Sequence, residues 1–125
     1  MRPFLLDSCT LLWATIVPEN LSIRAQNIIN DADSLIIVSH VTIWELSIKM
    51  SIGKLTLPHN FLNEVESHGY TLLPTALKHF GVFRKLPLLH KDPFDRLLIA
   101  QSISEKIPLI TCDPEIARYD VEVVW

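Results

Sequence analysis

The stretch His90-Lys91-Asp92-Pro93-Phe94-Asp95-Arg96-Leu97-Leu98-Ile99-Ala100-Gln101 organises the rest of the chain. Asp92 followed by Pro93 predicts a helix start, because aspartate caps the first turn and proline lacks only an N–H that a helix start leaves unpaired. Apolar residues then recur at helical spacing, so this helix should bury one side. Asp95 falls in the first turn, where the helix dipole favours an ionised carboxylate. Such an acid can bind a metal or simply belong to a helix start, and the positions of the other acids decide between the two.

Length and composition limit the possible protein classes. The chain has 125 residues, 49% of them hydrophobic, so we expect one globular domain over residues 1–125. No apolar run approaches the roughly 18 residues of a membrane span, and Asp7 interrupts the first apolar stretch, so we expect a cytoplasmic protein without an export signal. Cys9 and Cys112 should then be reduced thiols. The net charge of -3 argues against a purely electrostatic nucleic-acid binder, but it is compatible with an acidic site neutralised by cations.

Short apolar runs alternate with helical patterns along the whole chain. We expect strands at residues 4–6, 35–38, 70–73, 109–111 and 121–125. We expect helices at residues 8–14, 22–32, 41–52, 58–68, 75–83 and 93–106. Strands that are apolar on both sides are typical of parallel sheets covered by helices. The sequence therefore predicts an α/β three-layer sandwich with a mainly parallel central sheet and helices on both faces.

Four acids fall at equivalent positions of this expected fold. Asp7 and Asp113 directly follow two strands, Asp95 lies in the first turn of a crossover helix, and Glu45 lies one turn into another. Parallel strands end at one edge of the sheet, crossover helices begin there, and open α/β sheets bind ligands there. The four carboxylates should therefore converge, although Asp7 and Asp113 could instead be ordinary helix caps and Asp92 is better explained as a cap than as a ligand.

Glu45 provides a separate clue, because its helix is apolar over much of its surface. We expect this helix to pack through the stripe Val41, Trp44, Ile48 and Ile52. Glu45 falls inside this stripe, where an ionised carboxylate would cost on the order of several kcal/mol unless it were paired or bound a cation. The alternative is an i, i+4 ion pair with Lys49 on a face that is partly exposed to solvent.

His90 lies just before the 93–106 helix. It could contact a substrate or simply be a loop or core-lining residue.

Clustered carboxylates repel one another and favour hard divalent cations. Mg²⁺ or Mn²⁺ fits better than Zn²⁺, because the sequence lacks a Cys/His ligand set. A cation in such a centre can activate water to hydrolyse a phosphodiester bond. The chain has neither a Gly-rich phosphate loop nor a G-x-S-x-G motif, which argues against nucleotide kinases and serine hydrolases.

Several segments together resemble the PIN domain, over essentially the whole chain and in the family's order. They are Leu5–Ser8, Ser39–Lys49, Gly53–Leu55, Leu86–Pro87, His90–Arg96, Ala100–Gln101, Thr111–Asp113 and Trp125. They are most similar to the VapC-type toxins of bacterial type II toxin–antitoxin systems. The resemblance implies an Mg²⁺- or Mn²⁺-dependent endoribonuclease with the catalytic residues Asp7, Glu45, Asp95 and Asp113. It also implies a homodimer, and a cognate antitoxin whose C-terminal segment occupies the active-site groove.

Within this resemblance, Asp7, Asp95 and Asp113 are expected to bind the metal, and Glu45 to complete the shell or to orient the attacking water. Ser8 stands where the family often has threonine, and Cys9 where the subgroup often has histidine. Ser8 keeps a hydroxyl, so neither departure puts activity in doubt. The candidates for holding RNA phosphates are Lys49, Lys54, Lys91 and Arg96.

Three alternatives remain open from the sequence. The chain could be a non-catalytic protein-interaction module, or a DNA nuclease that uses the same metal chemistry. A receiver-like phosphoacceptor domain has a similar length and fold class. That alternative requires paired acids after the first strand and a lysine after a late strand, and neither is evident here.

Overall fold

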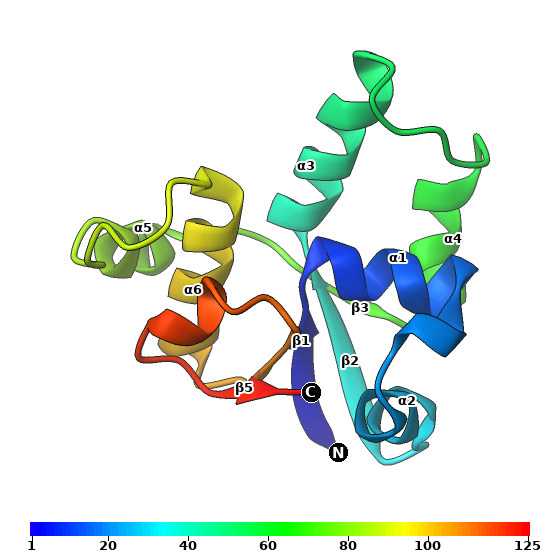
Figure 1. The fold of residues 1–125 in the computed structure, drawn as a ribbon, viewed down its shortest axis with the longest axis horizontal. Helices are drawn as coiled ribbons and strands as arrows, with labels where there is room; N and C mark the ends of the chain where they lie inside the picture. Colours follow the sequence, from blue (N-terminus) through cyan, green and yellow to red (C-terminus); the bar gives the residue numbers. More distant parts are fainter.

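The computed structural model describes all 125 residues and contains one five-stranded sheet, in the order β3-β2-β1-β4-β5 (Figure 1). The strands are β1 (Arg2–Leu6), β2 (Ser34–Ser39), β3 (Thr71–Leu73), β4 (Leu109–Ile110) and β5 (Val123–Val124). Every neighbouring pair is parallel, and the longest register aligns Arg2 with Ser34 and Leu6 with Val38. The predicted parallel sheet is confirmed.

Helices connect these strands. The α-helices are α1 (Ser8–Ile16), α2 (Ile23–Asn30), α3 (His40–Ser51), α4 (Phe61–Ser67), α5 (Leu77–Phe83) and α6 (Pro93–Glu105). Two 3₁₀ helices are η1 (Pro18–Asn20) and η2 (Ile116–Arg118). All six predicted α-helices are present. After α3 the chain turns at Gly53, whose φ of 75° lies in the left-handed region that favours glycine.

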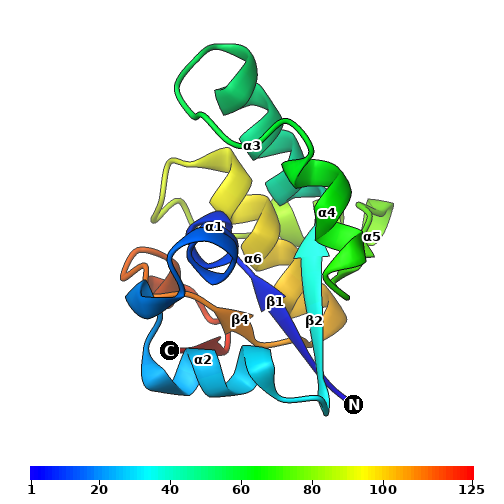
Figure 2. The ribbon, with the colours of Figure 1, turned by 90° about the vertical axis from the view of Figure 1, so that its right-hand side faces the viewer.

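Alternate residues of β1 enter two different cores, which gives the molecule its three layers. Phe4 and Leu6 pack with residues of α1, α2 and α4 on one face of the sheet. Leu5 points the other way and packs with Leu98 and Ile99 of α6. Figure 2 shows the sheet running between these helices, and α5 packs against α6. Helices therefore cover both faces, as predicted.

The buried face predicted for α3 was correct at Val41 and wrong at Trp44 and Ile52. Trp44 and Ile52 are 57% and 59% exposed, whereas the buried residues of α3 are Val41, Thr42, Glu45 and Leu46. Because α3 is apolar on several sides, its sequence does not identify the buried face; contacts with α1, α6 and β2 decide it. Ile23 at the start of α2 is exposed, because that helix packs mainly through Ala25 and Ile28.

A buried polar network joins the sheet to α5 and α6. The Ser39 hydroxyl donates to Oε1 of Gln101, and both side chains are fully buried. His79 accepts a 2.9 Å hydrogen bond from the Ala76 N–H at Nδ1, so its Nε2–H donates to Glu105 at 2.8 Å. This network fixes the start of α3 and the packing of α5 on α6. Of these helices, α3 and α6 flank the acidic edge described below.

None of the helices has both the length and the apolar character needed to cross a membrane.

Candidate active site

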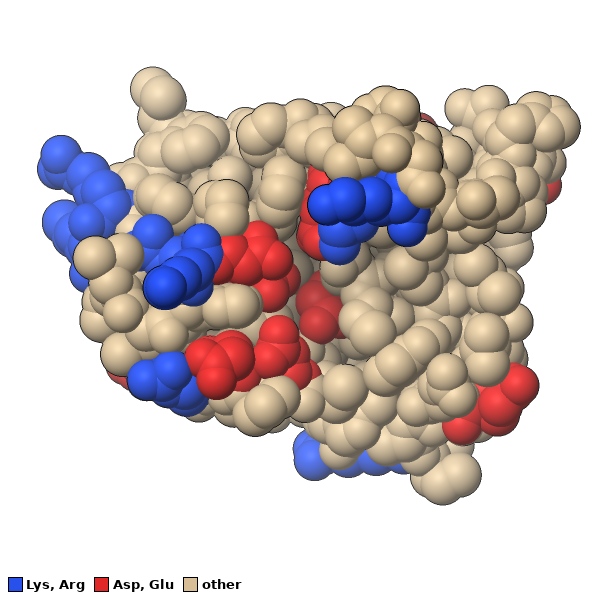
Figure 3. Space-filling view, turned by 45° about the horizontal axis from the view of Figure 1, so that its top comes forward, with Lys and Arg blue, Asp and Glu red and all other residues tan.

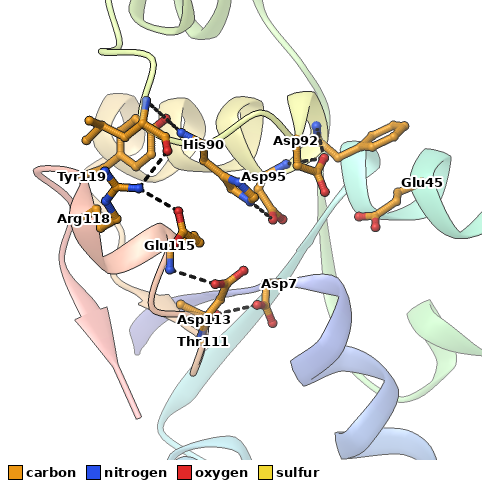
Figure 4. Close-up of polar contacts among 12 residues, drawn as sticks. Asp7, Glu45, His90, Asp92, Asp95, Thr111, Asp113, Glu115, Arg118 and Tyr119 are labelled. Atoms are coloured by element: carbon orange, nitrogen blue, oxygen red, sulfur yellow. Dashed lines mark hydrogen bonds and ion pairs between the residues drawn. The ribbon is translucent and has the colours of Figure 1, made fainter.

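The acids gather at the carboxyl ends of β1 and β4. From β1 the chain passes to β2 on one side, whereas β4 lies on the other side, so β1 and β4 flank the point where the strand order reverses. Ligands bind at this point in open α/β sheets. Asp7 follows β1 and Asp113 follows β4, and Figure 4 shows their carboxylates side by side.

Asp7 is buried and tightly held. It is the N-cap of α1, and its Oδ1 accepts a 2.8 Å hydrogen bond from the Thr10 N–H. Its Oδ2 accepts a 2.5 Å hydrogen bond from the Thr111 hydroxyl. Burial raises the pKa of Asp7, and the negative charge of Asp113 adds to this effect, while the hydrogen bonds oppose it. A bound cation would favour the ionised form that burial disfavours.

Asp113 is placed by the turn that follows β4. Its N–H donates to the Thr111 hydroxyl at 3.0 Å, and its Oδ1 accepts a 2.9 Å hydrogen bond from the Glu115 N–H. Thr111 therefore contacts both Asp7 and Asp113 and sets the spacing between the two strand ends. Aspartate followed by proline is typical of such a turn. The second carboxylate oxygen of Asp113, Oδ2, makes no hydrogen bond within the protein.

Asp95 reaches the same place from the first turn of α6. Asp92 caps this helix, as predicted, because its Oδ1 accepts from the N–H of Phe94 at 2.9 Å and of Asp95 at 3.4 Å. Asp95 is left free to contact His90, whose Nε2 lies 2.9 Å from its Oδ2. Burial raises the pKa of Asp95 to about 6; the bond to His90 opposes this shift, and the charges of Asp92, Glu45 and Asp7 add to it.

Glu45 lies on the α3 side of the site (Figure 4). Its side chain is only 7% exposed and forms a 2.7 Å ion pair with Nζ of Lys49, which is about half exposed. This pair was the alternative expected from the sequence, and it raises the pKa of Lys49. The charge of Glu45 also acts on Asp95. Glu45 is therefore both paired and part of the acidic cluster.

The four predicted acids thus come from four separate segments to one edge of the sheet. Figure 3 shows the acidic side chains gathered in a hollow of this face, with basic side chains on either side. The tightest group of possible metal ligands is His90, Asp95 and Asp113, whose donor atoms lie within 4.8 Å of one another. Asp7 lies just outside this group, hydrogen-bonded to Thr111, and Glu45 lies farther along α3.

Sequence reasoning missed three residues of the site. Thr111 was part of the PIN-like segment but received no role. Tyr119 was not considered; its hydroxyl accepts hydrogen bonds from the N–H groups of Leu89 and His90 at 3.1 and 2.9 Å. His90 was expected either to contact a substrate or to be a loop or core-lining residue, and its position five residues before Asp95 is the one local signal that it could reach the acid. The contacts of Thr111 and Tyr119 are long-range and have no such signal.

The structure gives Arg96 a different role from the phosphate contact expected for it. Its guanidinium lies 4.7 Å from the ring centre of Phe83, and one nitrogen donates to the Leu86 carbonyl at 3.4 Å. Arg96 therefore joins α6 to the end of α5. Lys54 and Lys91 are exposed, and Lys49 is already paired with Glu45.

The two cysteines are free and exposed near the acids. Partial burial and the charge of Asp7 raise the pKa of Cys9 to about 11, so Cys9 is a neutral thiol at pH 7. Burial likewise raises the pKa of Cys112. No cysteine belongs to the group of donor atoms that lie within 4.8 Å of one another, which consists of carboxylate oxygens and one imidazole nitrogen. These donors fit a six-coordinate Mg²⁺ or Mn²⁺ ion and do not fit a thiolate-bound zinc site.

The architecture is shared with solved structures of low sequence identity. One is the crystal structure of VapBC2 from Rickettsia felis bound to a DNA fragment from its promoter, with a TM-score of 0.76, 14% identity, and 99% of each chain covered. Another is FitAcB from Neisseria gonorrhoeae, with a TM-score of 0.63, 16% identity, and coverage of 98% of this chain and 96% of that chain. FitAB bound to an IR36 DNA fragment has a TM-score of 0.67, 16% identity, and coverage of 97% and 93%.

A search of curated protein sequences found no significant match. The family model for the PIN domain, in contrast, matches residues 4–122. This range includes most of β1, all of β2, β3 and β4, and all four converging acids; β5 lies just beyond it. Together with the parallel sheet and the acidic edge, the match shows that the chain belongs to the PIN domain family.

Proposed function

We propose that this protein is an Mg²⁺- or Mn²⁺-dependent endoribonuclease that acts as the toxin of a type II toxin–antitoxin pair. The observation that carries the proposal is the convergence of Asp7, Glu45, Asp95 and Asp113 on one edge of a parallel sheet. One structural neighbour is a VapBC complex by its name, and the sequence resembles the VapC-type toxins, which together support the biological role.

The site residues divide into two sets by their contacts. Asp95 and Asp113 offer carboxylate oxygens with few internal partners, so they are the principal metal ligands. Asp7 is held rigidly by Thr10 and Thr111 and completes the anionic pocket. A divalent cation supplies a Lewis acid that activates water and stabilises charge on the phosphate. Glu45, across the site, is placed to orient that water or accept its proton.

The direct test uses the purified chain with a mixed RNA substrate, with and without Mg²⁺ or Mn²⁺. We expect cleavage that leaves a 5′-phosphate and a 3′-hydroxyl and that stops on chelation. Asp7→Asn and Asp95→Asn should abolish cleavage while preserving the circular dichroism spectrum. Full activity in either variant would refute the assignment.

Two further arms separate the alternatives. A DNA substrate tested beside the RNA distinguishes a ribonuclease from a DNA nuclease with the same chemistry. An absence of cation-dependent cleavage of either nucleic acid would favour a non-catalytic interaction module. Sequencing of RNA ends from cells that express the chain alone would identify the RNA target.

The proposal includes two protein partners. The first is a cognate antitoxin whose C-terminal segment occupies the acidic hollow. The second is another copy of the chain, so that the protein forms a homodimer. An apolar surface between α3, α5 and α6 supports this part of the proposal. The residues lining this surface are Val41, Trp44, Phe80, Phe83, Pro93, Phe94 and Leu97, around a depression of about 130 Å³. Exposed aromatic side chains grouped in this way are typical of protein interfaces.

A further inference from the structure

His90 lies in the acidic site, and the proposed mechanism does not use it. Its Nε2 lies 2.9 Å from Oδ2 of Asp95, and a donor atom of Asp113 lies within 4.8 Å of both. The three side chains come from two segments, the loop before α6 together with its first turn, and the turn after β4. All three are partly buried, so they line the hollow without being sealed from solvent.

The backbone of His90 is held by the same segment that carries Asp113. The Tyr119 hydroxyl accepts from the N–H groups of both Leu89 and His90, and Tyr119 is buried. Arg118 donates a 3.0 Å hydrogen bond to the Leu89 carbonyl and a 2.9 Å one to Glu115 (Figure 4). The position of His90 relative to Asp113 is therefore set before any cation binds, as preorganised metal sites require.

We propose that Nε2 of His90 binds the divalent cation directly, together with Asp95 and Asp113, and that this nitrogen shifts the preference of the site from Mg²⁺ toward Mn²⁺. The inference rests on the proposed function, since it concerns the same metal site. Donor atoms bound at about 2.1 Å to one cation lie at most about 4.2 Å apart. A set already within 4.8 Å needs a movement of well under about 1 Å to meet that limit.

The proton balance allows this ligation. In the metal-free protein, the Nε2–H of His90 donates to the Asp95 carboxylate. Nδ1 of His90 makes no hydrogen bond within the protein, so the neutral ring can carry its proton there and present the Nε2 lone pair to the cation. Metal ligation requires this tautomer. The proton moves from Nε2 to Nδ1, so the ring exchanges one hydrogen bond to Asp95 for a metal bond at the same atom.

The metal preference follows from donor chemistry. Mg²⁺ is bound mainly by carboxylates, phosphates and water, whereas imidazole suits the first-row transition metals. Mn²⁺ accepts both kinds of donor. A nitrogen ligand should therefore strengthen Mn²⁺ binding more than Mg²⁺ binding, which is a difference that a residue acting only by orienting Asp95 would not produce.

The test is electron spin-echo spectroscopy of Mn²⁺ bound to the full chain. We expect a nitrogen coupling typical of a bound imidazole, which changes when the histidines are labelled with ¹⁵N. The coupling should disappear in His90→Gln and persist in His40→Gln, because His40 is an exposed residue at the start of α3. By calorimetry, His90→Gln should weaken Mn²⁺ binding about tenfold or more and Mg²⁺ binding distinctly less.

The outcomes separate this inference from the proposed function. Mn²⁺ bound without a nitrogen coupling, or with a coupling that survives in His90→Gln, would overturn the role of His90 and leave the nuclease proposal intact. Equal losses of Mn²⁺ and Mg²⁺ affinity would also count against direct ligation. A wild-type chain that binds neither ion would overturn both. If His90→Gln fails to fold, the wild-type spectrum still tests the inference, because His90 is the one histidine in the group of possible metal ligands.

Discussion

The Thr111 hydroxyl donates a 2.5 Å hydrogen bond to Oδ2 of Asp7, across 104 positions of the chain. The hydroxyl oxygen of Thr111 also accepts a hydrogen bond from the N–H of Asp113. One hydroxyl thus joins the ends of two adjacent strands at the point where their acids meet. The bond also lowers the pKa of Asp7, which opposes the increase that burial causes.

Replacing Thr111 with valine should therefore weaken metal binding. Without the hydroxyl, the pKa of Asp7 rises further and its carboxylate loses its orientation. We expect divalent-cation affinity to fall about 10- to 100-fold, as for other residues that orient metal ligands, and stability to fall by about 1–3 kcal/mol. Calorimetric titration with Mn²⁺ measures the affinity. Thr111→Ser should restore most of it, and a Thr111→Val variant with wild-type affinity would show that the bond is dispensable.

Asp95 should make the metal-free protein less stable at neutral pH than in mild acid. Its pKa is about 6 in the folded state and near 3.8 when unfolded, so the folded state binds more protons between these values and loses stability as pH rises through them. Asp95→Asn should therefore stabilise the metal-free protein by about 1–2 kcal/mol at pH 7.5, after allowance for partial exposure.

Urea unfolding in the presence of a chelator, at pH 7.5 and pH 4.5, measures this effect. The advantage of Asp95→Asn should shrink toward the lower pH, where wild-type Asp95 is largely protonated in the folded state. Glu19→Gln, at an exposed acid of η1, provides the control. A destabilising Asp95→Asn at pH 7.5 would mean that like-charge repulsion and burial do not dominate at this position.

Tyr119→Phe should loosen the loop that carries His90. The variant keeps the buried ring and removes only the oxygen that accepts from Leu89 and His90. Hydrogen exchange of these two amides, followed by NMR, should accelerate about fivefold or more, which corresponds to about 1 kcal/mol per lost bond. Tyr70→Phe is the matched control, because the Tyr70 hydroxyl makes no hydrogen bond within the protein. Unchanged exchange at both amides would show that other contacts hold the loop.

Trp44 and Phe80 should control dimer formation. They are 57% and 46% exposed on the apolar surface between α3, α5 and α6, so their replacement leaves the core intact. We expect Trp44→Ser with Phe80→Ser to shift the protein from dimer to monomer in sedimentation equilibrium. Ile23→Ser, at an exposed apolar residue of α2, should have no such effect. A dimer that persists in the double variant would place the interface elsewhere.

The fold and the acidic edge were predictable for a common physical reason. Strands that are apolar on both sides imply a parallel sheet, and a parallel sheet brings residues after its strands to one edge whatever their separation in sequence. That rule alone predicts the positions of Asp7 and Asp113 at this edge. The position of Asp95 follows once Asp92-Pro93 is identified as the start of its helix.

The details that the sequence did not reveal depend on tertiary contacts. Because α3 is apolar on several sides, an apolar stripe through Trp44 and Ile52 was as plausible as the true buried face through Glu45 and Leu46. The Tyr119 hydroxyl acts on backbone groups about 30 positions away, and no local pattern encodes such a contact.

Asp7 begins α1 with the same carboxylate that it contributes to the site. Selection for a folded protein and selection for a reactive one therefore act on the same few atoms. Replacement by alanine would remove the cap as well as the charge, whereas asparagine can still accept the Thr10 N–H. Spontaneous loss-of-function mutants that retain the folded chain should accordingly carry asparagine or serine at this position more often than apolar residues.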